Sequence, residues 1–117
     1  MNLHQLIDIQ EVFDSKHNWS TKGKSGKELI NSLSNDIVGL VGELGEFSNI
    51  VKKIALEKEN PAVLEAIMIE QHPNLSEELI DTFIYLMRLS SLLNIDIEKE
   101  YLLKLEKNRI RFQKYEK

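Results

Sequence analysis

Four acidic residues, arranged as two pairs, are the residues best suited to carry chemistry. Glu43 and Glu46 are three positions apart, and Glu78 and Asp81 repeat that spacing later in the chain. Residues three apart share one face of an α-helix, so each pair places two carboxylates side by side. Both pairs also lie among apolar neighbours, which predicts positions beside a helix-packing interface. If the two helices pack through these faces, four negative charges converge.

A cluster of four carboxylates is typical of a site for a hard divalent cation. Carboxylates held close together repel one another, which raises their pKa values unless a cation compensates their charge. Oxygen ligands favour Mg²⁺, with Mn²⁺ as the substitute ion. The sequence therefore predicts a metal site formed by Glu43, Glu46, Glu78 and Asp81. The alternative is that both pairs lie on ordinary solvated helix faces, which predicts acids that are exposed and distant from one another.

Three glycines recur every three residues in the segment that carries the first acid pair. Gly39, Gly42 and Gly45 each cost a helix about 1 kcal/mol relative to alanine. They lie along the same side of the predicted helix as the glutamates. This position favours close packing of a second helix, or space for a metal or ligand beside the backbone, and the two explanations are compatible.

Further polar residues extend these faces. Tyr85 follows Asp81 by four positions, Arg88 follows Tyr85 by three, and Lys53 lies two turns after Glu46. One stripe on the last predicted helix carries two cations and an amide, namely Lys104, Asn108 and Arg111. Cations that face an acid cluster across a metal-bound phosphate would be electrostatically favourable. The alternative is a solvated face near a helix C-terminus, where Lys and Arg are favoured in any case.

Other common catalytic arrangements are missing from the sequence. The three histidines, His4, His17 and His72, supply no pair of Glu-x-x-His motifs, which argues against a carboxylate-bridged di-iron site. There is no Gly-x-x-x-x-Gly-Lys-Ser/Thr phosphate loop and no nucleophilic serine elbow. The histidines are therefore interpreted as ordinary surface or loop residues.

The elements that must position these residues are predicted to be helices. Apolar residues recur at intervals of three or four, and no long segment alternates with the period of two that a strand requires. The predicted helices cover residues 3–13, 37–55, 61–71 and 75–92, with a final helix from residue 97. The fold class is all-α, a bundle of about four main helices.

Polar residues, glycines and prolines mark the expected ends of these helices. Two polar stretches are predicted loops, residues 14–27 and 57–60. Asn60 followed by Pro61 predicts a helix start, because Asn is a favourable N-cap and Pro is tolerated at the first helical position. His72 is predicted to end a helix, since the residue before Pro73 is pushed out of helical geometry. Asp96 is a second predicted N-cap.

Length and composition indicate one ordinary globular domain. The chain has 117 residues, 42% of them hydrophobic and 29% charged, and it contains no cysteine. A single domain spanning residues 1–117 is expected. The lack of cysteine excludes a disulfide scaffold and fits a reducing compartment, and no signal peptide or membrane span is recognised, so a cytoplasmic protein is expected. The net charge of −4 argues against a general binder of nucleic-acid polymers.

The acid motifs resemble those of a known enzyme family. Val41-Gly-Glu-Leu-Gly-Glu46, followed by Glu77-Glu-Leu-Ile-Asp-Thr-Phe-Ile-Tyr-Leu86, is similar to the MazG-like all-α nucleoside triphosphate pyrophosphohydrolases, whose signature is Glu-x-x-Glu, a spacer and Glu-x-x-Asp. The closing Lys104-x-x-x-Asn108-x-x-Arg111 resembles the end of the dCTP pyrophosphatase branch. The resemblance covers about residues 33–112. It implies a MazG-type, four-helix-bundle-like fold that assembles as a homodimer or homotetramer.

The resemblance also implies an activity. Family members hydrolyse a nucleoside triphosphate between the α and β phosphates, giving a monophosphate and pyrophosphate, which here suggests sanitation of the nucleotide pool. The four acids would hold Mg²⁺, with Glu43 and Glu46 in catalytic roles and Glu43 helping to activate the attacking water. The residues expected to contact the substrate are Trp19, which would stack on the base, and Lys53, Tyr85, Lys104, Asn108 and Arg111.

Departures from the family pattern leave alternatives. The His-x-Pro-Arg-Asn segment that follows the N-terminal Trp in the dCTP branch is missing, and residues 20–30 replace it. The base is therefore undetermined, and phosphoribosyl-ATP or a damaged nucleotide is an alternative substrate. A second hypothesis is a non-catalytic helical oligomerisation or regulatory module that retains the fold, which predicts that the four acids bind no metal.

Overall fold

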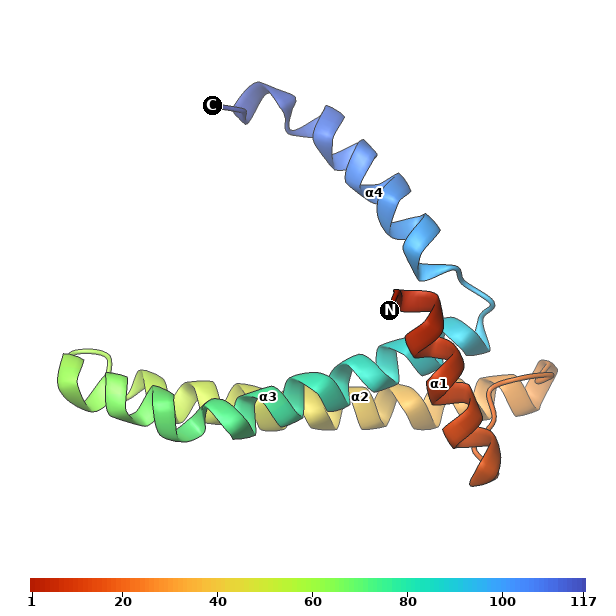
Figure 1. Cartoon of the computed structure of the whole chain (residues 1–117), viewed down its shortest axis with the longest axis horizontal. Helices are drawn as coiled ribbons and strands as arrows, with labels where there is room; N and C mark the ends of the chain where they lie inside the picture. The colour runs from red at the N-terminus through yellow and green to blue at the C-terminus, as the bar shows by residue number, and fades with distance from the viewer.

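The computed structural model describes all 117 residues, and they form helices and connecting loops without a strand (Figure 1). The four helices are α1 (Leu3–Lys16), α2 (Gly26–Ala55), α3 (Pro61–Leu92) and α4 (Ile97–Arg111), and a 3₁₀ turn covers Gln113–Tyr115. The all-α prediction is confirmed. None of these helices combines the length with the apolar character that a bilayer crossing requires.

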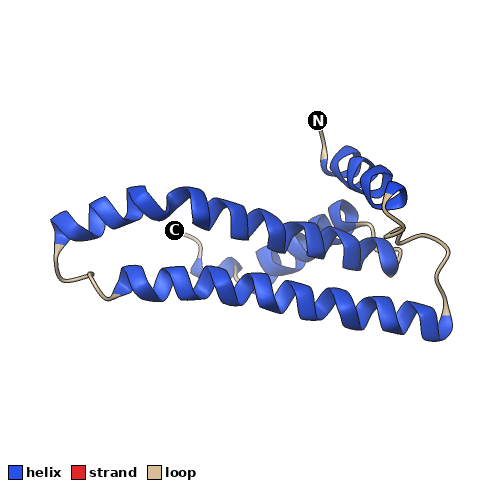
Figure 2. Ribbon diagram, turned by 90° about the horizontal axis from the view of Figure 1, so that it is seen from below, coloured by secondary structure: helices blue, strands red, loops and turns tan.

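Two long antiparallel helices form the body of the molecule. α2 has 30 residues and α3 has 32, and they pack side by side along most of their length (Figures 1 and 2). Asn60 caps α3 by accepting from the amide of Val63, and Pro61 takes the first helical position as predicted. This α2–α3 hairpin brings the two acid motifs opposite each other, because each motif lies near the middle of its helix.

α2 begins well before the predicted position. The helix starts at Gly26, whereas the sequence predicted a loop through residue 27 and a helix from residue 37. Leu29, Ile30 and Leu33 continue the helical spacing of apolar residues towards the N-terminus, and no glycine or proline lies between Gly26 and Gly39. The extension matters for the site, because it places Asp36 inside the helix.

The predicted break at Pro73 is wrong, because α3 continues through it. A proline inside a helix removes one hydrogen bond and crowds the carbonyl four residues earlier, here that of Ile69. Pro73 and Ile69 are both exposed, so water can satisfy the freed carbonyl. Packing against α2 on both sides of the proline holds the helix together. The expected helices 61–71 and 75–92 are therefore one element.

The two remaining helices are attached at one end of the hairpin. α1 crosses the C-terminal end of α3, and α4 leads away from the hairpin (Figure 1). Asp96 caps α4 by accepting from the amide of Lys99 at 3.1 Å, which confirms the predicted start. No residue of α4 is buried. The interior of the single chain is therefore made mainly by two helices, and only three apolar residues are buried, Ile54, Met87 and Leu92.

Candidate metal and ligand site

Three of the four predicted metal ligands converge on the α2–α3 hairpin. Glu43 and Glu46 lie one turn apart on α2, and the antiparallel α3 presents Glu78 to them. One carboxylate oxygen from each residue lies within 4.8 Å of the others. Glu43 and Glu78 are half-buried, whereas Glu46 is exposed. We call these residues the acid triad, and their convergence disagrees with the alternative of scattered surface acids.

The acid triad is electrostatically unbalanced as it stands. A hydrogen bond with Glu43, the burial of the carboxyl and the proximity of Glu46 together raise the pKa of Glu78 to about 8. One oxygen of Glu78, Oε2, is buried and has no hydrogen-bond partner. Buried carboxylate oxygens are normally satisfied, so this atom has unused capacity to accept a proton or a cation. A hard divalent ion would satisfy it and offset most of the negative charge that the three carboxylates carry when ionised.

The fourth predicted ligand, Asp81, lies beside the acid triad. It follows Glu78 by one turn of α3, and with Glu43 it borders a cavity of about 720 Å³. That volume is in the range of cavities that bind small organic ligands. The cavity is formed by α2, α3, the end of α1 and the loop that follows α1. Glu43 is thus shared between the acid triad and the cavity.

An aromatic wall borders the same cavity. Phe13 lies in the last turn of α1, and Trp19 lies in the following loop, which the φ of +61° at Asn18 turns back towards α2. His17 stacks on Trp19 with ring centroids 5.1 Å apart, and it packs on Phe13 at 4.4 Å. The His17 ring also bonds through Nδ1 to the carbonyl of Phe13 at 2.7 Å. The Trp19 indole remains 55% exposed, so it offers an open face for stacking.

Tyr85 also borders the cavity, and a glycine on α2 explains its position. A Cβ atom added to Gly39 would overlap the Tyr85 ring, whereas a Cβ at Gly42 or Gly45 would meet nothing within 4 Å. Gly39 therefore allows the ring to pack directly on the α2 backbone. Close packing therefore explains Gly39, whereas Gly42 and Gly45 are exposed and face open space.

A buried ion-pair network, which was not among the sequence predictions, lies at the end of the cavity near α1. Arg88 on α3 pairs with Asp14 on α1 at 2.8 Å and with Asp36 on α2 at 3.0 Å. Burial alone would lower the pKa of Arg88, but the two carboxylates outweigh it and raise the pKa. Asp36 precedes Glu43 by seven residues, as Arg88 follows Asp81 by seven. That shared heptad spacing was the available signal, since residues seven apart lie on one helix face.

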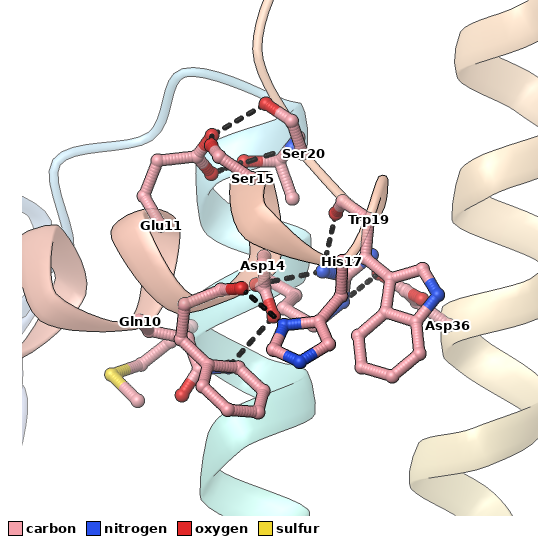
Figure 3. A network of polar contacts seen from close by, with 12 residues as sticks. Gln10, Glu11, Asp14, Ser15, His17, Trp19, Ser20 and Asp36 are labelled. Carbon is pink, nitrogen blue, oxygen red and sulfur yellow. Dashed lines mark hydrogen bonds and ion pairs between the residues drawn. The ribbon is translucent and has the colours of Figure 1, made fainter.

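A second polar cluster folds the loop after α1 onto that helix (Figure 3). The carboxylate of Glu11 accepts from the hydroxyls of Ser15, Ser20 and Thr21. Burial opposes ionisation of Glu11, yet the hydrogen bonds prevail and lower its pKa. The network thereby fixes the loop segment that immediately follows Trp19.

Not all predicted substrate residues reach the cavity within one chain. Trp19 and Tyr85 border it together with Glu43 and Asp81. Lys53 is exposed in the last turn of α2, where the helix dipole favours a cation. The three predicted residues on α4 also lie outside the cavity, and these are Lys104, Asn108 and Arg111.

The arrangement can bind a hard cation at one end of a cavity and stack a flat ring at its side. Donors for a polar ligand come from Tyr85, Lys24 and the amides of Asn18 and Asn35. In comparisons with known proteins, no family model, no curated protein and no solved structure matches this chain.

Proposed function

We propose that this chain is a Mg²⁺-dependent nucleotide pyrophosphohydrolase. It would convert a (deoxy)nucleoside triphosphate into the monophosphate and pyrophosphate, as part of nucleotide-pool sanitation in the cytoplasm. The observation that carries the proposal is the acid triad at the edge of a cavity with an aromatic wall. A nucleoside triphosphate combines a flat base with a phosphate chain that binds Mg²⁺, so it matches both halves of the site. The order of the acid motifs, which resembles the MazG-like family, is additional support.

The donor set fits the proposed ion. All three residues of the acid triad offer carboxylate oxygens, and the unpartnered Oε2 of Glu78 is an open ligand position. Asp81 is the fourth acid proposed to hold the ion, by its position one turn beyond Glu78. When bound, Mg²⁺ would polarise the phosphoryl oxygens and neutralise charge that develops on them.

The chain's own residues would orient the reactants. In the proposed reaction, the oxygen of water bonds to the α-phosphorus, and the bond from that phosphorus to the oxygen bridging the β-phosphate breaks. Glu43 belongs to the acid triad and also borders the cavity, so it is the residue proposed to accept the proton of the water. The indole of Trp19 would stack on the base, and the hydroxyl of Tyr85 would donate to the sugar or a phosphate.

We also propose that the working form is a homodimer or homotetramer. The radius of gyration is 18.3 Å, whereas a compact chain of this length has about 13 Å. Apolar side chains on α4 are exposed, among them Tyr101, Leu102 and Leu105. A second copy could cover them. In such an assembly Lys104, Asn108 and Arg111 would serve the cavity of a neighbouring copy, which would account for their position outside the cavity of their own chain.

A panel of canonical and modified nucleoside triphosphates, assayed for pyrophosphate with Mg²⁺ or Mn²⁺, tests the activity. We expect turnover of at least one member, and a loss of more than about a hundredfold in kcat in Glu46→Ala and in Asp81→Ala. Glu70→Gln is the matched control, because Glu70 is an exposed acid on α3 outside the acid triad and the cavity. If no triphosphate is hydrolysed with either ion, the enzyme proposal fails.

The exposed face of α4 also supports a second candidate, a non-catalytic oligomerisation or regulatory module. The two candidates differ in cation and ligand binding. Calorimetry with Mg²⁺ and a non-hydrolysable triphosphate separates them, because the module predicts binding of neither. Binding of both, lost in Glu46→Ala, would contradict the module.

A further inference from the structure

Arg88 on α3 bonds to α2 and to the end of α1 with its following loop, which lie 52 to 74 residues away in sequence. Its Nη1 donates to Asp14 at the end of α1 at 2.8 Å, and to the backbone carbonyl of Trp19 at 2.8 Å. Its Nε donates to Asp36 on α2 at 3.0 Å. Figure 3 shows the residues that accept these bonds, Asp14, Trp19 and Asp36, close to one another. A single guanidinium therefore joins α1, the loop and the hairpin.

The network is buried and nearly saturated. The side chains are only 14% exposed for Arg88, 4% for Asp14 and 10% for Asp36. The second oxygen of Asp14 accepts from the amide of Gln10 at 2.9 Å. Removal of one member of such a network leaves buried charge without a partner, which is strongly unfavourable. The attachment of α1 and the loop to the two long helices thus relies on this side chain, whereas the Glu11 cluster holds the loop on α1.

α1 has little else to hold it on the hairpin. Its two buried residues are Glu11 and Asp14, both polar, whereas Val12 and Phe13 are more than half exposed. At the other end of α1, His4 pairs with Asp96 and with Glu98 at the start of α4, not with the hairpin. The contact through Arg88 is therefore the main polar link between the aromatic wall and the helices that carry the acid triad.

We propose that Arg88 is a positioning residue that holds the Trp19 indole beside the cavity and so sets the affinity for the ring of the ligand. It does so without a role in cation binding, since it lies seven residues, about 10 Å along α3, from Asp81. The part about ligand affinity rests on the proposed function. The part about Trp19 does not, and it can be measured on the protein without a ligand.

Trp19 is the only tryptophan, so its fluorescence reports directly on the proposed link. We expect the time-resolved anisotropy of the indole to show a wider range of motion in Arg88→Ala than in the parent. Arg88→Lys should be intermediate, because lysine carries its donors on a single nitrogen, whereas Arg88 donates from both Nε and Nη1. Arg109→Ala is the matched control, since Arg109 pairs only with Glu106 on the exposed face of α4. Unchanged indole motion in Arg88→Ala would overturn the proposal.

If Arg88→Ala does not fold, as loss of its helical circular dichroism would show, a second variant takes its place. Arg88→Gln combined with Asp14→Asn and Asp36→Asn removes all three buried charges together, so no charge is left unpaired. Restored helix content with increased indole motion supports the positioning role. Restored helix content with the parent's indole motion overturns it.

Ligand measurements then separate this inference from the proposed function. For Arg88→Lys we expect affinity for a non-hydrolysable triphosphate to fall about tenfold, as loss of one stacking contact predicts, with KM raised and kcat retained. The affinity for Mg²⁺ alone should stay within about twofold of the parent. Equal losses of Mg²⁺ and triphosphate affinity would overturn the positioning role. A parent protein that binds no triphosphate, yet shows the expected change in indole motion, would overturn the proposed function and leave the link to Trp19 supported.

Discussion

At the scale of single residues, the acid triad holds an exchangeable proton when no cation is bound. Glu43, burial and Glu46 together raise the pKa of Glu78 to about 8, so this carboxyl is mostly protonated at about pH 7. A cation in the acid triad displaces that proton. We expect the binding of one Mg²⁺ to release close to one proton at about pH 7. At about pH 9 it should release almost none, because Glu78 is then already ionised. Calorimetry in buffers of different ionisation enthalpy measures this release.

The same proton links stability to pH in the cation-free protein. The folded-state pKa of Glu78 lies above its ordinary value of 4.5, so its contribution to stability is complete below the ordinary value and is lost as pH rises through about 8. Added Mg²⁺ should therefore raise the melting temperature more in mildly alkaline than in mildly acidic buffer. Glu78→Gln should remove this difference and Glu70→Gln should keep it. An equal effect of Mg²⁺ at both pH values would contradict the assignment.

The contact of Tyr85 with Gly39 gives a second prediction at the residue scale. Gly39→Ala adds a Cβ that overlaps the Tyr85 ring, so the ring must leave its place on α2. We expect KM for the triphosphate to rise about tenfold, although alanine favours the helix by about 1 kcal/mol. Gly42→Ala is the control, because its Cβ meets open space, and it should gain stability without a change in KM. Equal KM values for the two variants would argue against a role for Tyr85.

At the scale of the elements, Pro73 weakens a helix that forms in spite of it. Pro73→Ala restores a backbone N–H in the middle of α3, at an exposed position where the new side chain meets no crowding. We expect the free energy of unfolding to rise by about 2 kcal/mol, which is the helix penalty of proline less its stiffening of the unfolded chain. Pro61→Ala should change stability little, because proline suits the first helical position. Urea denaturation compares the two, and no gain for Pro73→Ala would mean that α3 is already interrupted there.

The elements also show what the sequence could and could not predict. The caps at Asn60 and Asp96 follow from local rules, and so does the position of each acid pair on one face of its own helix, since each depends on neighbours within a few residues. That Glu78 meets the first pair depends on how α2 and α3 pack. The continuity of α3 at Pro73 depends on packing against α2, which local propensity does not contain. The network at Arg88 was missed for a similar reason: Asp14 was assigned to a loop, and its partner lies 74 residues away.

At the scale of the whole molecule, the exposed apolar surface and the open shape both support the proposed assembly of several copies. The hairpin leaves Val41, Leu44, Leu79 and Ile80 about half exposed or more, and α4 buries none of its residues. The extents of 52 × 42 × 29 Å describe an open arrangement rather than a closed bundle. Apolar surface on this scale is normally covered by another chain. The proposed assembly would bury it and bring the cations of α4 towards an acid triad.

The assembly can be tested by changing α4 without touching the site. Leu102→Glu with Leu105→Glu adds two negative charges to an exposed apolar face, and Lys107→Glu makes the same change in net charge at an exposed polar position of that helix. We expect light scattering to give twice or four times the chain mass of 13.6 kDa for the parent and for Lys107→Glu. The double variant should give the mass of a single chain. Burial of a leucine stabilises an interface by about 2 kcal/mol, whereas burial of an unpaired carboxylate is strongly unfavourable.

If the assembly also supplies α4 residues to the cavity, the double variant should lose triphosphate turnover and retain Mg²⁺ binding. A parent protein with the mass of one chain would refute the assembly, and full turnover by a monomeric double variant would show that each chain works alone.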